Sequence, residues 1–364
     1  MRILRVAQNL YPEVPGGGTY HVHAMSRDQA AVGHDVTVLT VSDDKSLPRQ
    51  EVRDGYSIVR RAPTLEVLGN QISTGVSRFL CHARDFDVIH AHSHLYFSTN
   101  LAAIQRQIGN IPLAITNHGL YSQNAPKWLF DFYLHTAGRW TFDQADVVFC
   151  YTEEDRERVR RFGIDSRIEV VPNGVDTDRF TPNGEGSDMV DHDGPVVLFV
   201  GRLVEGKKPE IAVDAVSRLP EELNAKLYII GDGPLRSKME SRGNLSAVEF
   251  LGQVPYEKMP AIYRAGDVLI LPSRAEGLPR TVLEAMASDV PVVVSDLEQV
   301  APLIEEAGVA VPVGNVDRFT AGIKTVLDGS MENPRKVVDE TFDWDYTVEQ
   351  TTATLSKLTG DFHR

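Results

Sequence analysis

Residues 271–287 read LPSRAEGLPRTVLEAMA, and they decide how the second half of the chain is interpreted. The apolar run Val268–Leu271 predicts a buried β-strand, and the apolar spacing that follows it predicts a helix. Glu276 then lies in the loop between strand and helix, and Glu284 lies on the helix, with seven residues between the two. One carboxylate is therefore expected at the mouth of the helix and the other on its body.

These two carboxylates have the chemistry of a polyol-binding site. A carboxylate accepts hydrogen bonds from hydroxyl groups, and the backbone N–H groups of Gly277 and Leu278 are expected beside Glu276. A solvated surface glutamate is an adequate alternative for Glu276. It is a poor alternative for Glu284, because Glu284 lies within the apolar run Val282–Ala287.

The same order of strand and helix extends along the whole chain. In the first half strands are expected at Ile3–Ala7, Asp35–Thr40, Ile58–Arg61, Val88–Ala91, Leu113–Thr116, Val147–Tyr151 and Ile168–Val171. In the second half they are expected at Val196–Val200, Lys226–Ile230, Val248–Leu251, Val268–Leu271, Val292–Ser295 and Val309–Val311. This alternation indicates parallel sheets, so the expected fold class is α/β with two Rossmann-like, doubly wound domains.

Composition suggests where the domains end. Residues 181–194 read TPNGEGSDMVDHDG, which is polar and lacks apolar periodicity, and we expect a linker there. Residues 1–180 would form the first domain and residues 195–342 the second. Residues 343–364 have helical character and are expected to cross back to the first domain. Since open α/β sheets bind ligands beyond the carboxyl ends of their strands, the chemistry is expected in the loops there.

Two further loops of this kind contain glycine or basic residues. Gly16, Gly17 and Gly18 precede an expected helix, where backbone N–H groups can bind an anion or a sugar hydroxyl and only glycine allows a close approach. A flexible turn is the alternative. Arg202 and Lys207 lie five residues apart in a turn after a strand, where they can converge on a diphosphate. A solvated basic turn is the alternative there.

A dinucleotide-binding site is a weaker interpretation of a third loop. Residues 229–236 read IIGDGPLR and begin like the fingerprint of such sites, but Arg236 occupies the place of the third glycine. Phe250 and Leu251 stand where an acidic residue would end the next strand. We therefore expect no NAD site.

Composition limits the class of protein. A chain of 364 residues suggests two domains, and its two cysteines make neither a disulfide framework nor a four-cysteine zinc site. Without a long apolar run or a leader pattern, we expect a soluble, cytoplasmic protein. The net charge of −14 argues against nucleic-acid binding. Acidic residues outnumber basic ones, and few of the basic residues are lysines. This composition favours a protein from a salt-rich cytoplasm, with an ordinary acidic enzyme as the alternative.

Taken in order, the loop motifs resemble a known family. They are GGG at 16–18, NHG at 117–119, VPNGVD at 171–176, FVGRL at 199–203, IIGDGP at 229–234, FLGQVP at 250–255 and the glutamates at 276 and 284. This set resembles glycosyltransferase family 4, whose GT-B fold has two Rossmann-like domains facing each other across a cleft. The resemblance covers nearly the whole chain, from the first strand to the segment that begins at Trp344.

The resemblance implies roles for the charged residues of the second half. Arg202 and Lys207 would stabilise the departing nucleoside diphosphate. Glu276 would hold the hydroxyls of the donor sugar, and Glu284 would bind the donor ribose.

The resemblance also implies neighbours of the base and of the sugar. Gln253 and Val254 would lie along the base. His118 would turn toward the donor sugar, although a histidine after a strand is more often structural. The remaining donor-site residues would be Gly16, Gly17, Gly18, Gly277 and Leu278.

The reaction implied by the resemblance is hexosyl transfer with retention at the anomeric carbon. The donor would be a UDP- or GDP-linked sugar, and the acceptor a glycan or a polyprenyl-linked molecule. Cations and helix dipoles would stabilise the charge that develops on the diphosphate. No cofactor and no essential metal is expected, because Arg202 and Lys207 supply positive charge. The acidic chain is expected to contain Asp-x-Asp triplets by chance, at 85/87, 176/178, 191/193 and 343/345.

The chain departs from the family pattern at three places. Residues 296–299 read DLEQ where a Gly-Gly turn is usual, Ser288-Asp289 replaces a glycine-containing turn, and Lys208 stands where glycine is common. The first departure affects the expected identity of the donor sugar more than it affects the expected transfer reaction.

The acceptor is expected on the first domain. Aromatic residues and two leucines gather in one segment there, and arginines gather in the next. They are Trp128, Leu129, Phe130, Phe132, Tyr133, Leu134, Trp140 and Phe142, then Arg156, Arg158, Arg160, Arg161 and Arg167. Such a pair of segments can contact a membrane at the inner face, where a polyprenyl-linked acceptor would lie. An interior helix followed by a solvated helix is the alternative.

Two other functions fit the same residues. One is a nucleotide-sugar 2-epimerase on the same fold, which would act without an acceptor. The other is a catalytically silent subunit that only binds a nucleotide-sugar. The presence of Arg202, Lys207, Glu276 and Glu284 together argues against the silent subunit.

Overall fold

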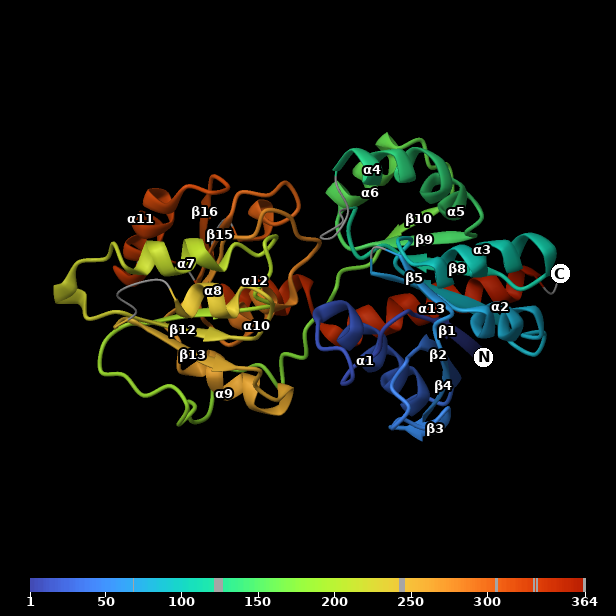
Figure 1. The fold of residues 1–364 in the computed structure, drawn as a ribbon, viewed down its shortest axis with the longest axis horizontal. Helices are drawn as coiled ribbons and strands as arrows, with labels where there is room; N and C mark the ends of the chain where they lie inside the picture. Colours follow the sequence, from blue (N-terminus) through green and yellow to red (C-terminus); the bar gives the residue numbers. More distant parts are fainter. Residues whose placement is uncertain are drawn as a thin grey trace. The chain divides into compact units, whose positions relative to one another are not determined.

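Two compact α/β units make up the structure, a computed structural model that describes residues 1–67, 69–120, 127–241, 246–304, 307–329, 331 and 333–362 (Figure 1). The first unit contains Met1–Pro172 and Thr347–Arg364, and the second contains Asn173–Tyr346. Each unit has its own mainly parallel sheet with helices packed on it. The predicted fold class, α/β with two doubly wound sheets, is confirmed.

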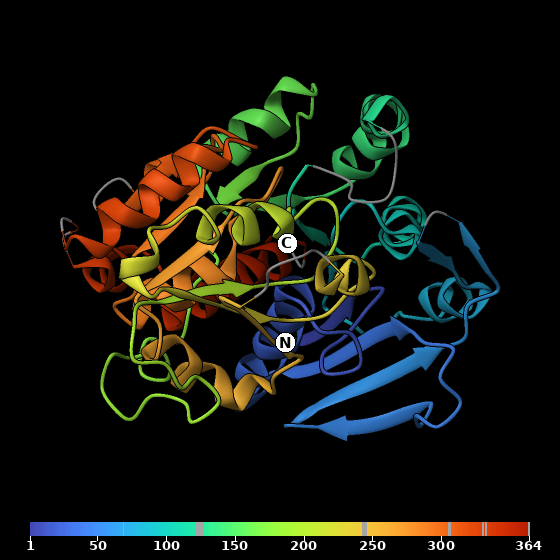
Figure 2. The ribbon, with the colours of Figure 1, turned by 60° about the vertical axis from the view of Figure 1, so that its left-hand side comes forward.

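The first unit is built on an eight-stranded sheet in the order β10-β9-β8-β7-β1-β2-β4-β3. Only the edge pair β3 and β4 is antiparallel, and both strands are visible in blue in Figure 2. The strands are β1 Arg2–Val6, β2 Asp35–Val41, β3 Gln50–Arg53, β4 Tyr56–Arg61, β7 Val88–His92, β8 Leu113–Thr116, β9 Val147–Cys150 and β10 Ile168–Val170. A separate hairpin pairs β5 Leu65–Val67 with β6 Asn70–Ile72.

Helices cover both faces of this sheet. They are α1 Gly17–Ala31, α2 Thr74–Cys81, α3 Phe97–Ile108, α4 Lys127–Tyr133, a π-helical turn Leu134–Gly138, α5 Arg139–Asp143, α6 Glu153–Arg161 and α13 Trp344–Phe362. Successive residues of β1 enter different cores, because strand side chains alternate between faces: Leu4 packs with Leu80, and Ile3 packs with Leu355 of α13. Figure 1 shows α13 near α1, where Gln29 Nε2 donates to Thr352 Oγ1 at 2.9 Å.

The second unit has a six-stranded parallel sheet in the order β13-β12-β11-β14-β15-β16. Its strands are β11 Val196–Val200, β12 Lys226–Ile230, β13 Val248–Gly252, β14 Val268–Leu271, β15 Val292–Ser295 and β16 Gly308–Val311. Its longer helices are α7 Pro209–Val216, α10 Arg280–Ala287, α11 Val316–Leu327 and α12 Pro334–Thr341. Shorter turns of helix are α8 Arg236–Glu240, α9 Met259–Arg264, Glu221–Leu223, Tyr256–Lys258 and Ala301–Ile304.

The segment 181–194, expected as a linker, lies within the second unit. Its backbone is tied to that unit: Ser187 N donates to the Ala261 carbonyl at 3.0 Å, and Arg264 Nε donates to the Glu185 carbonyl at 2.9 Å. The units divide at Pro172/Asn173 and at Tyr346/Thr347 instead. A polar composition therefore marks an irregular segment here, and hydrogen bonds decide the unit to which it belongs.

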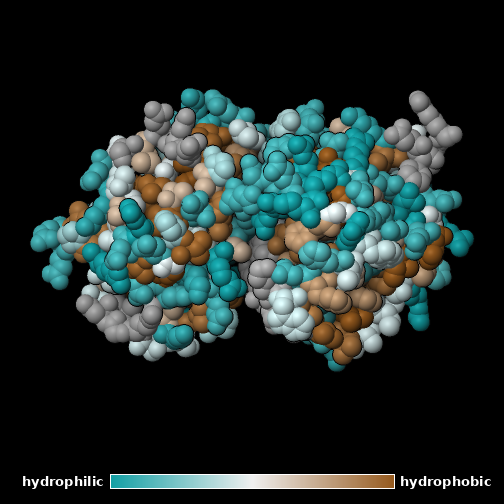
Figure 3. Space-filling view, turned by 90° about the horizontal axis from the view of Figure 1, so that it is seen from above, coloured by the Kyte–Doolittle hydropathy of each residue, from teal (hydrophilic) through white to brown (hydrophobic). Residues whose placement is uncertain are grey.

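Hydrophilic residues predominate on the surface seen in Figure 3, with smaller hydrophobic patches between them. Within the described part of the chain, no helix combines the length and the apolar character needed to cross a membrane.

Two departures from the family pattern fall at backbone positions that favour glycine. Lys208, directly before α7, has φ +52°, and Asp289, just after α10, has φ +63°. A left-handed conformation is strained for residues with a Cβ, whereas glycine adopts it freely, and glycine is common just after a helix. The glycines that are usual at these places thus have a conformational explanation, and this chain accepts the strain.

We expect Asp289→Gly to raise the free energy of unfolding by about 1 kcal/mol, because it relieves the left-handed strain. Urea denaturation of both proteins measures the difference. Ser288→Gly is the matched control: Ser288 has φ −85° and its hydroxyl donates to the Glu284 carbonyl, so this change should destabilise. Equal destabilisation by both substitutions would contradict the assignment of strain to Asp289.

Candidate active site

The candidate site of the second unit lies where its strand order reverses. β11 and β14 are adjacent in the sheet although two strands separate them in sequence. Open α/β sheets bind ligands at such a switch point, beyond the carboxyl ends of the strands. The loop that carries Arg202 and Lys207 follows β11, and the loop that carries Glu276 follows β14. A backbone hydrogen bond of 2.8 Å, from Arg274 N to the Gly206 carbonyl, joins the two loops.

Lys207 and Glu276 form an ion pair between these loops. The distance from Lys207 Nζ to Glu276 Oε1 is 2.5 Å, and the side chains are 14% and 6% exposed. The aliphatic part of Lys207 folds back toward Gly201, where an added Cβ would lie 3.9 Å from Lys207 Cδ. The ammonium group is therefore held at the switch point, while Arg202 lies exposed five residues earlier.

The loop that departs from the family pattern also reaches this site. Gln299 follows β15, is 5% exposed, and its side-chain amide donates to the backbone carbonyl of Glu276. The sequence shows that residues 296–299 depart from the family pattern, but it does not indicate that Gln299 contacts the backbone of Glu276. A polar side chain here thus replaces the usual glycine turn and fixes the loop on which the carboxylate lies.

The glycines of the GDG turn after β12 have a structural role beside the loop of Arg202. A Cβ at Gly233 would lie 2.5 Å from the Leu203 carbonyl oxygen, and one at Gly231 would clash with the Gly201 backbone. Hydrogen bonds run both ways, from Leu203 N to the Asp232 carbonyl at 2.9 Å and from Leu235 N to the Leu203 carbonyl at 3.0 Å. The turn therefore positions the backbone that presents Arg202.

Glu284 is buried on α10 with both of its carboxylate oxygens hydrogen-bonded. Tyr256 donates to Oε1 at 2.7 Å and Tyr263 donates to Oε2 at 2.9 Å, while Arg280 Nε lies 3.6 Å from Oε1. Burial raises the pKa of Glu284, and Arg280 opposes this shift. Burial and the neighbouring Glu284 raise the pKa of Tyr263, so its hydroxyl remains a donor. The inference that Glu284 is not a solvated glutamate agrees with its 4% exposure.

Arg280 connects Glu284 to the turn of the VPNGVD motif. Its Nη1 donates to the Gly174 carbonyl at 2.8 Å and lies 3.5 Å from Asn173 Oδ1, and its guanidinium lies 5.4 Å from the centre of the Trp344 ring. Tyr256, Tyr263 and Arg280 were missed by sequence reasoning. The only signal was the arginine one helical turn before Glu284, which favours an ion pair.

Gln253 and Val254 follow β13, with Gln253 exposed and Val254 half-buried. Tyr256 follows two residues after Val254 and bonds Glu284, so this loop is joined to the helix of Glu284. Gly277 and Leu278 are both buried just before α10. All of these predicted residues lie in loops and a helix of the second unit. Lys207 contacts Glu276 directly, and Tyr256 links Glu284 to the loop of Gln253 and Val254.

The other predicted residues lie in the first unit, in loops at the carboxyl edge of its sheet. Gly16, Gly17 and Gly18 follow β1, and α1 begins at Gly17. His118 follows β8, and a Cβ at Gly18 would lie 3.6 Å from His118 Nδ1. The glycine segment and His118 are therefore neighbours, as the strand order predicts.

Both ring nitrogens of His118 have partners. Nε2 lies 3.1 Å from His92 Nδ1, and Nδ1 lies 2.8 Å from the Tyr151 hydroxyl. Burial lowers the pKa of His118 to about 4, so the ring is neutral at pH 7. His118 thus carries no positive charge, and it can hydrogen-bond a ligand only in exchange for the contact with His92 or Tyr151. The alternation of histidines at 90 and 92 along β7 was the signal for His92; nothing in the sequence indicated Tyr151.

The Asp-x-Asp triplets have local structural contacts. Asp87 pairs with Arg2 at 3.4 Å, Asp176 Oδ1 accepts from Arg179 N at 2.9 Å, and Asp343 Oδ1 accepts from Tyr346 N at 3.0 Å. Within the part of the chain that the structure describes, no group of three or more His, Cys, Asp or Glu side chains is arranged to hold a metal ion.

Two α/β units of this kind, each with polar loops at the carboxyl edge of its sheet, define a two-domain Rossmann-like architecture. Comparison with known proteins identifies the family. The family model described as Glycosyltransferase Family 4 matches residues 15–179, and the model described as Glycosyl transferases group 1 matches residues 194–329. The chain belongs to glycosyltransferase family 4, the group 1 glycosyltransferases. The resemblance inferred from the loop motifs is thereby confirmed.

Relatives match over most of the chain. An uncharacterised glycosyltransferase of Methanocaldococcus jannaschii is 26% identical over 96% of this chain and 97% of its own. A D-inositol 3-phosphate glycosyltransferase of Acidothermus cellulolyticus is 29% identical over 96% of this chain and 88% of its own.

Solved structures support the same fold. The sucrose-phosphate synthase of Thermosynechococcus elongatus has a TM-score of 0.85 and 21% identity over 99% of both chains. The Anabaena protein HepE, in complex with UDP and glucose, has a TM-score of 0.81 and 21% identity over 98% of this chain and all of its own. The fold is GT-B, as predicted.

We expect Gly233→Ala to lower the free energy of unfolding by about 1–3 kcal/mol, because the Leu203 backbone must move to admit the methyl group. Thermal and urea denaturation measure this change. Gly360→Ala is the control, since a Cβ there meets nothing within 4 Å and alanine favours a helix. If Gly233→Ala were as stable as the wild type, the GDG turn would not hold the Arg202 loop.

Proposed function

We propose that this protein transfers a hexosyl group, with retention, from a UDP- or GDP-linked sugar to a glycan or lipid-linked acceptor. The observation that carries the proposal is the Lys207–Glu276 pair at the switch point between β11 and β14, with Arg202 in the same loop as Lys207. That HepE, which has a similar fold, was solved in complex with UDP-glucose supports a nucleotide-sugar as the donor.

The proposed chemistry is stabilisation of a leaving diphosphate. The bond from the anomeric carbon to the phosphate oxygen breaks, and the bond to the acceptor oxygen forms on the same face. The proton of the acceptor hydroxyl passes to the departing diphosphate. Negative charge grows on that diphosphate, and Arg202 and Lys207 stabilise it. Glu276 accepts hydrogen bonds from the hydroxyls of the sugar, which orients the anomeric carbon.

The remaining residues are proposed to position the donor. Glu284 takes the ribose hydroxyls, which requires that they replace or join the hydroxyls of Tyr256 and Tyr263 as its donors. Gln253 and Val254 lie along the base. His118, neutral and held by His92 and Tyr151, hydrogen-bonds the donor sugar, which requires that the sugar replace one of these two partners. No cofactor or essential metal is invoked, since Arg202 and Lys207 supply the positive charge.

A contact of the first unit with the inner membrane face is part of the proposal. The aromatic segment divides into two sets: Phe130, Leu134 and Phe142 are buried, whereas Trp128 and Phe132 are 72% and 65% exposed. Exposed aromatic side chains of this kind insert into the headgroup region of a bilayer. A donor made in the cytoplasm and a polyprenyl-linked acceptor would meet at that surface.

We expect the protein to sediment with vesicles that contain anionic lipid, and a Trp128→Ser, Phe132→Ser variant to sediment at least fivefold less. The variant should fold, because both side chains are exposed. Val52→Ser removes an apolar side chain that is 74% exposed on the edge strand β3 and serves as the control. Equal sedimentation of all three proteins, or none for the wild type, would contradict the membrane contact.

We expect Arg202→Ala and Glu276→Gln each to lower kcat/KM at least 100-fold, because each removes an interaction with a reacting group. The assay measures release of UDP or GDP from a panel of nucleotide-sugars with and without saccharide acceptors. Arg218→Ala, at an exposed arginine paired with Asp317, should leave the rate unchanged. NMR of the product should give the anomeric configuration of the donor.

Two results would overturn the proposal. Wild-type rates in Arg202→Ala or Glu276→Gln would contradict the assignment of the active site to these residues. A product with inverted anomeric configuration would contradict the retaining mechanism. Conversion of the donor sugar without an acceptor would point to a 2-epimerase. Binding of the donor without turnover on any acceptor would point to a silent subunit.

A further inference from the structure

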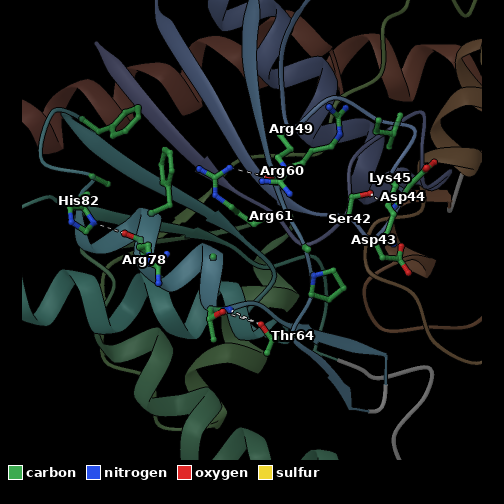
Figure 4. A pocket seen from close by; sticks show the side chains of 18 of the residues that line it. Ser42, Asp43, Asp44, Lys45, Arg49, Arg60, Arg61, Thr64, Arg78 and His82 are labelled. Atoms are coloured by element: carbon green, nitrogen blue, oxygen red, sulfur yellow. Dashed lines mark hydrogen bonds between the residues drawn. The ribbon is translucent and has the colours of Figure 1, made fainter.

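A large groove lies on the first unit, and its lining residues differ from the candidate site residues of that unit. It has a volume of about 1460 Å³ and is lined by the loop after β2, the end of β4 and one side of α2 (Figure 4). Neither the glycines 16–18 nor His118 lines it. Pockets for small molecules usually have volumes of about 300–1000 Å³, so this groove has room for several linked sugar rings.

Arginines dominate the middle of the groove. Figure 4 shows Arg49, Arg60 and Arg61 between the loop of Ser42–Lys45 and the helix that carries Arg78. Arg60 is neutralised, since its Nη2 pairs with Glu13 and Glu51 at 2.6 and 2.7 Å. Arg49, Arg61 and Arg78 have no carboxylate within 4.0 Å among the residues that the structure describes. Three unpaired guanidinium groups thus share one groove.

Arg61 is held in place at the floor of the groove. Its Nη1 donates to the Arg60 carbonyl at 3.0 Å, and its guanidinium lies 5.4 Å from the centre of the Phe79 ring. Gly75 of α2 lets the stem approach closely, since a Cβ there would lie 3.0 Å from Arg61 Cδ. Burial lowers the pKa of Arg61 and the charge of Arg49 lowers it further, which is the effect of two cations close together. The orientation of the guanidinium is therefore fixed before any ligand binds.

The acidic residues of the groove do not cancel these charges. Asp43 and Asp44 lie on the loop at one end of the groove, and Asp44 accepts hydrogen bonds from Ser46 at 2.6 and 2.8 Å. Asp85 lies beyond the other end of α2, and Lys45 adds a further cation beside the two aspartates. Five cationic side chains and three aspartates line the groove, so its lining has a net positive charge although the chain has a net charge of −14. Arginine is the side chain that best matches the two oxygens of a carboxylate or a phosphate.

We propose that this groove binds an acidic saccharide, whose carboxylate or phosphate groups lie on Arg49, Arg61 and Arg78. Phe79 and Phe86 supply apolar surface for the C–H faces of sugar rings, and Thr64 and Thr74 supply hydroxyls beside them. Given the proposed function, on which this step rests, the bound saccharide is the anionic part of the acceptor. The groove selects acceptors that carry negative charge.

The test is binding, with no turnover involved. Calorimetric titrations use trigalacturonic acid, glucose 6-phosphate, inorganic phosphate and neutral maltotriose as probes. We expect saturable binding of an acidic saccharide, none of maltotriose, and weaker binding at 0.5 M than at 0.05 M salt. Trigalacturonic acid and glucose 6-phosphate separate carboxylate from phosphate recognition, and inorganic phosphate tests whether the sugar contributes.

The decisive variant is Arg49→Gln, Arg78→Gln, which replaces two exposed arginines and should leave the fold intact. We expect it to weaken binding of the acidic saccharide at least tenfold. Arg84→Gln removes the same charge from an exposed arginine outside the groove and should bind like the wild type. Circular dichroism and thermal denaturation check the fold of each protein.

Three outcomes with the groove variants and probes would overturn the proposal, and a fourth comes from Arg202→Ala. The three are no saturable binding of any acidic probe, equal affinity in the double variant, and an equal loss in Arg84→Gln. Loss of binding in Arg202→Ala would also overturn it, since the probe would then occupy the donor loop. Failure of the proposed function has a different result, in which the protein binds the acidic saccharide through the groove but binds no nucleotide-sugar. That result would support a saccharide site in the groove and would contradict the transferase mechanism.

Discussion

The ion pair between Lys207 and Glu276 depends on the adjacency of two parallel strands, and most of the candidate site depends on that ion pair. β11 and β14 end at the same edge of the sheet, so the loops after them meet there. Both side chains are almost fully withdrawn from water. Removing one partner of a buried pair leaves the other charge uncompensated, at a cost of about 3–5 kcal/mol. The pair thus holds a cation and a carboxylate side by side. In the proposed reaction the cation meets the leaving diphosphate and the carboxylate meets a sugar hydroxyl.

The surrounding elements hold the two loops in place by close backbone contact and by hydrogen bonds. The GDG turn leaves no space for side chains beside Gly201 and Leu203, and Gln299 holds the backbone of Glu276. On α10, Glu284 accepts hydrogen bonds from Tyr256 and Tyr263 and lies beside Arg280. Arg280 also donates a hydrogen bond to the carbonyl of Gly174. A ligand of the proposed kind would therefore meet side chains whose orientation is already set, which lowers the entropy lost on binding.

Much of this arrangement could be predicted from the sequence, because the signals were local. Short apolar runs predicted every strand of the second sheet, and the apolar context of Glu284 indicated that it is buried. The short strands β3, β5 and β6 were missed, because they are polar and largely exposed and carry no apolar alternation. The composition of residues 181–194 predicts a linker, because composition contains no information on hydrogen bonds to distant residues.

Side-chain partners were the part that the sequence could not supply. Tyr151 lies 33 residues from His118, and Gln299 lies 23 residues from Glu276, so no local pattern connects them. The groove of Arg49, Arg61 and Arg78 likewise forms only when the loop after β2 meets β4 and α2. Residues whose role depends on a strand order could be named in advance, whereas residues that meet through tertiary packing required the structure.

Calorimetric titration with UDP, GDP, ADP and NAD, at low and at molar KCl, tests the central claim most directly. The claim is that the loops after β11 and β14 bind the diphosphate of a donor. It predicts saturable binding of one nucleoside diphosphate, weakened at least tenfold in Arg202→Ala, a substitution at an exposed side chain. Binding of no diphosphate in either salt, unchanged binding in Arg202→Ala, or tight binding of NAD would contradict it.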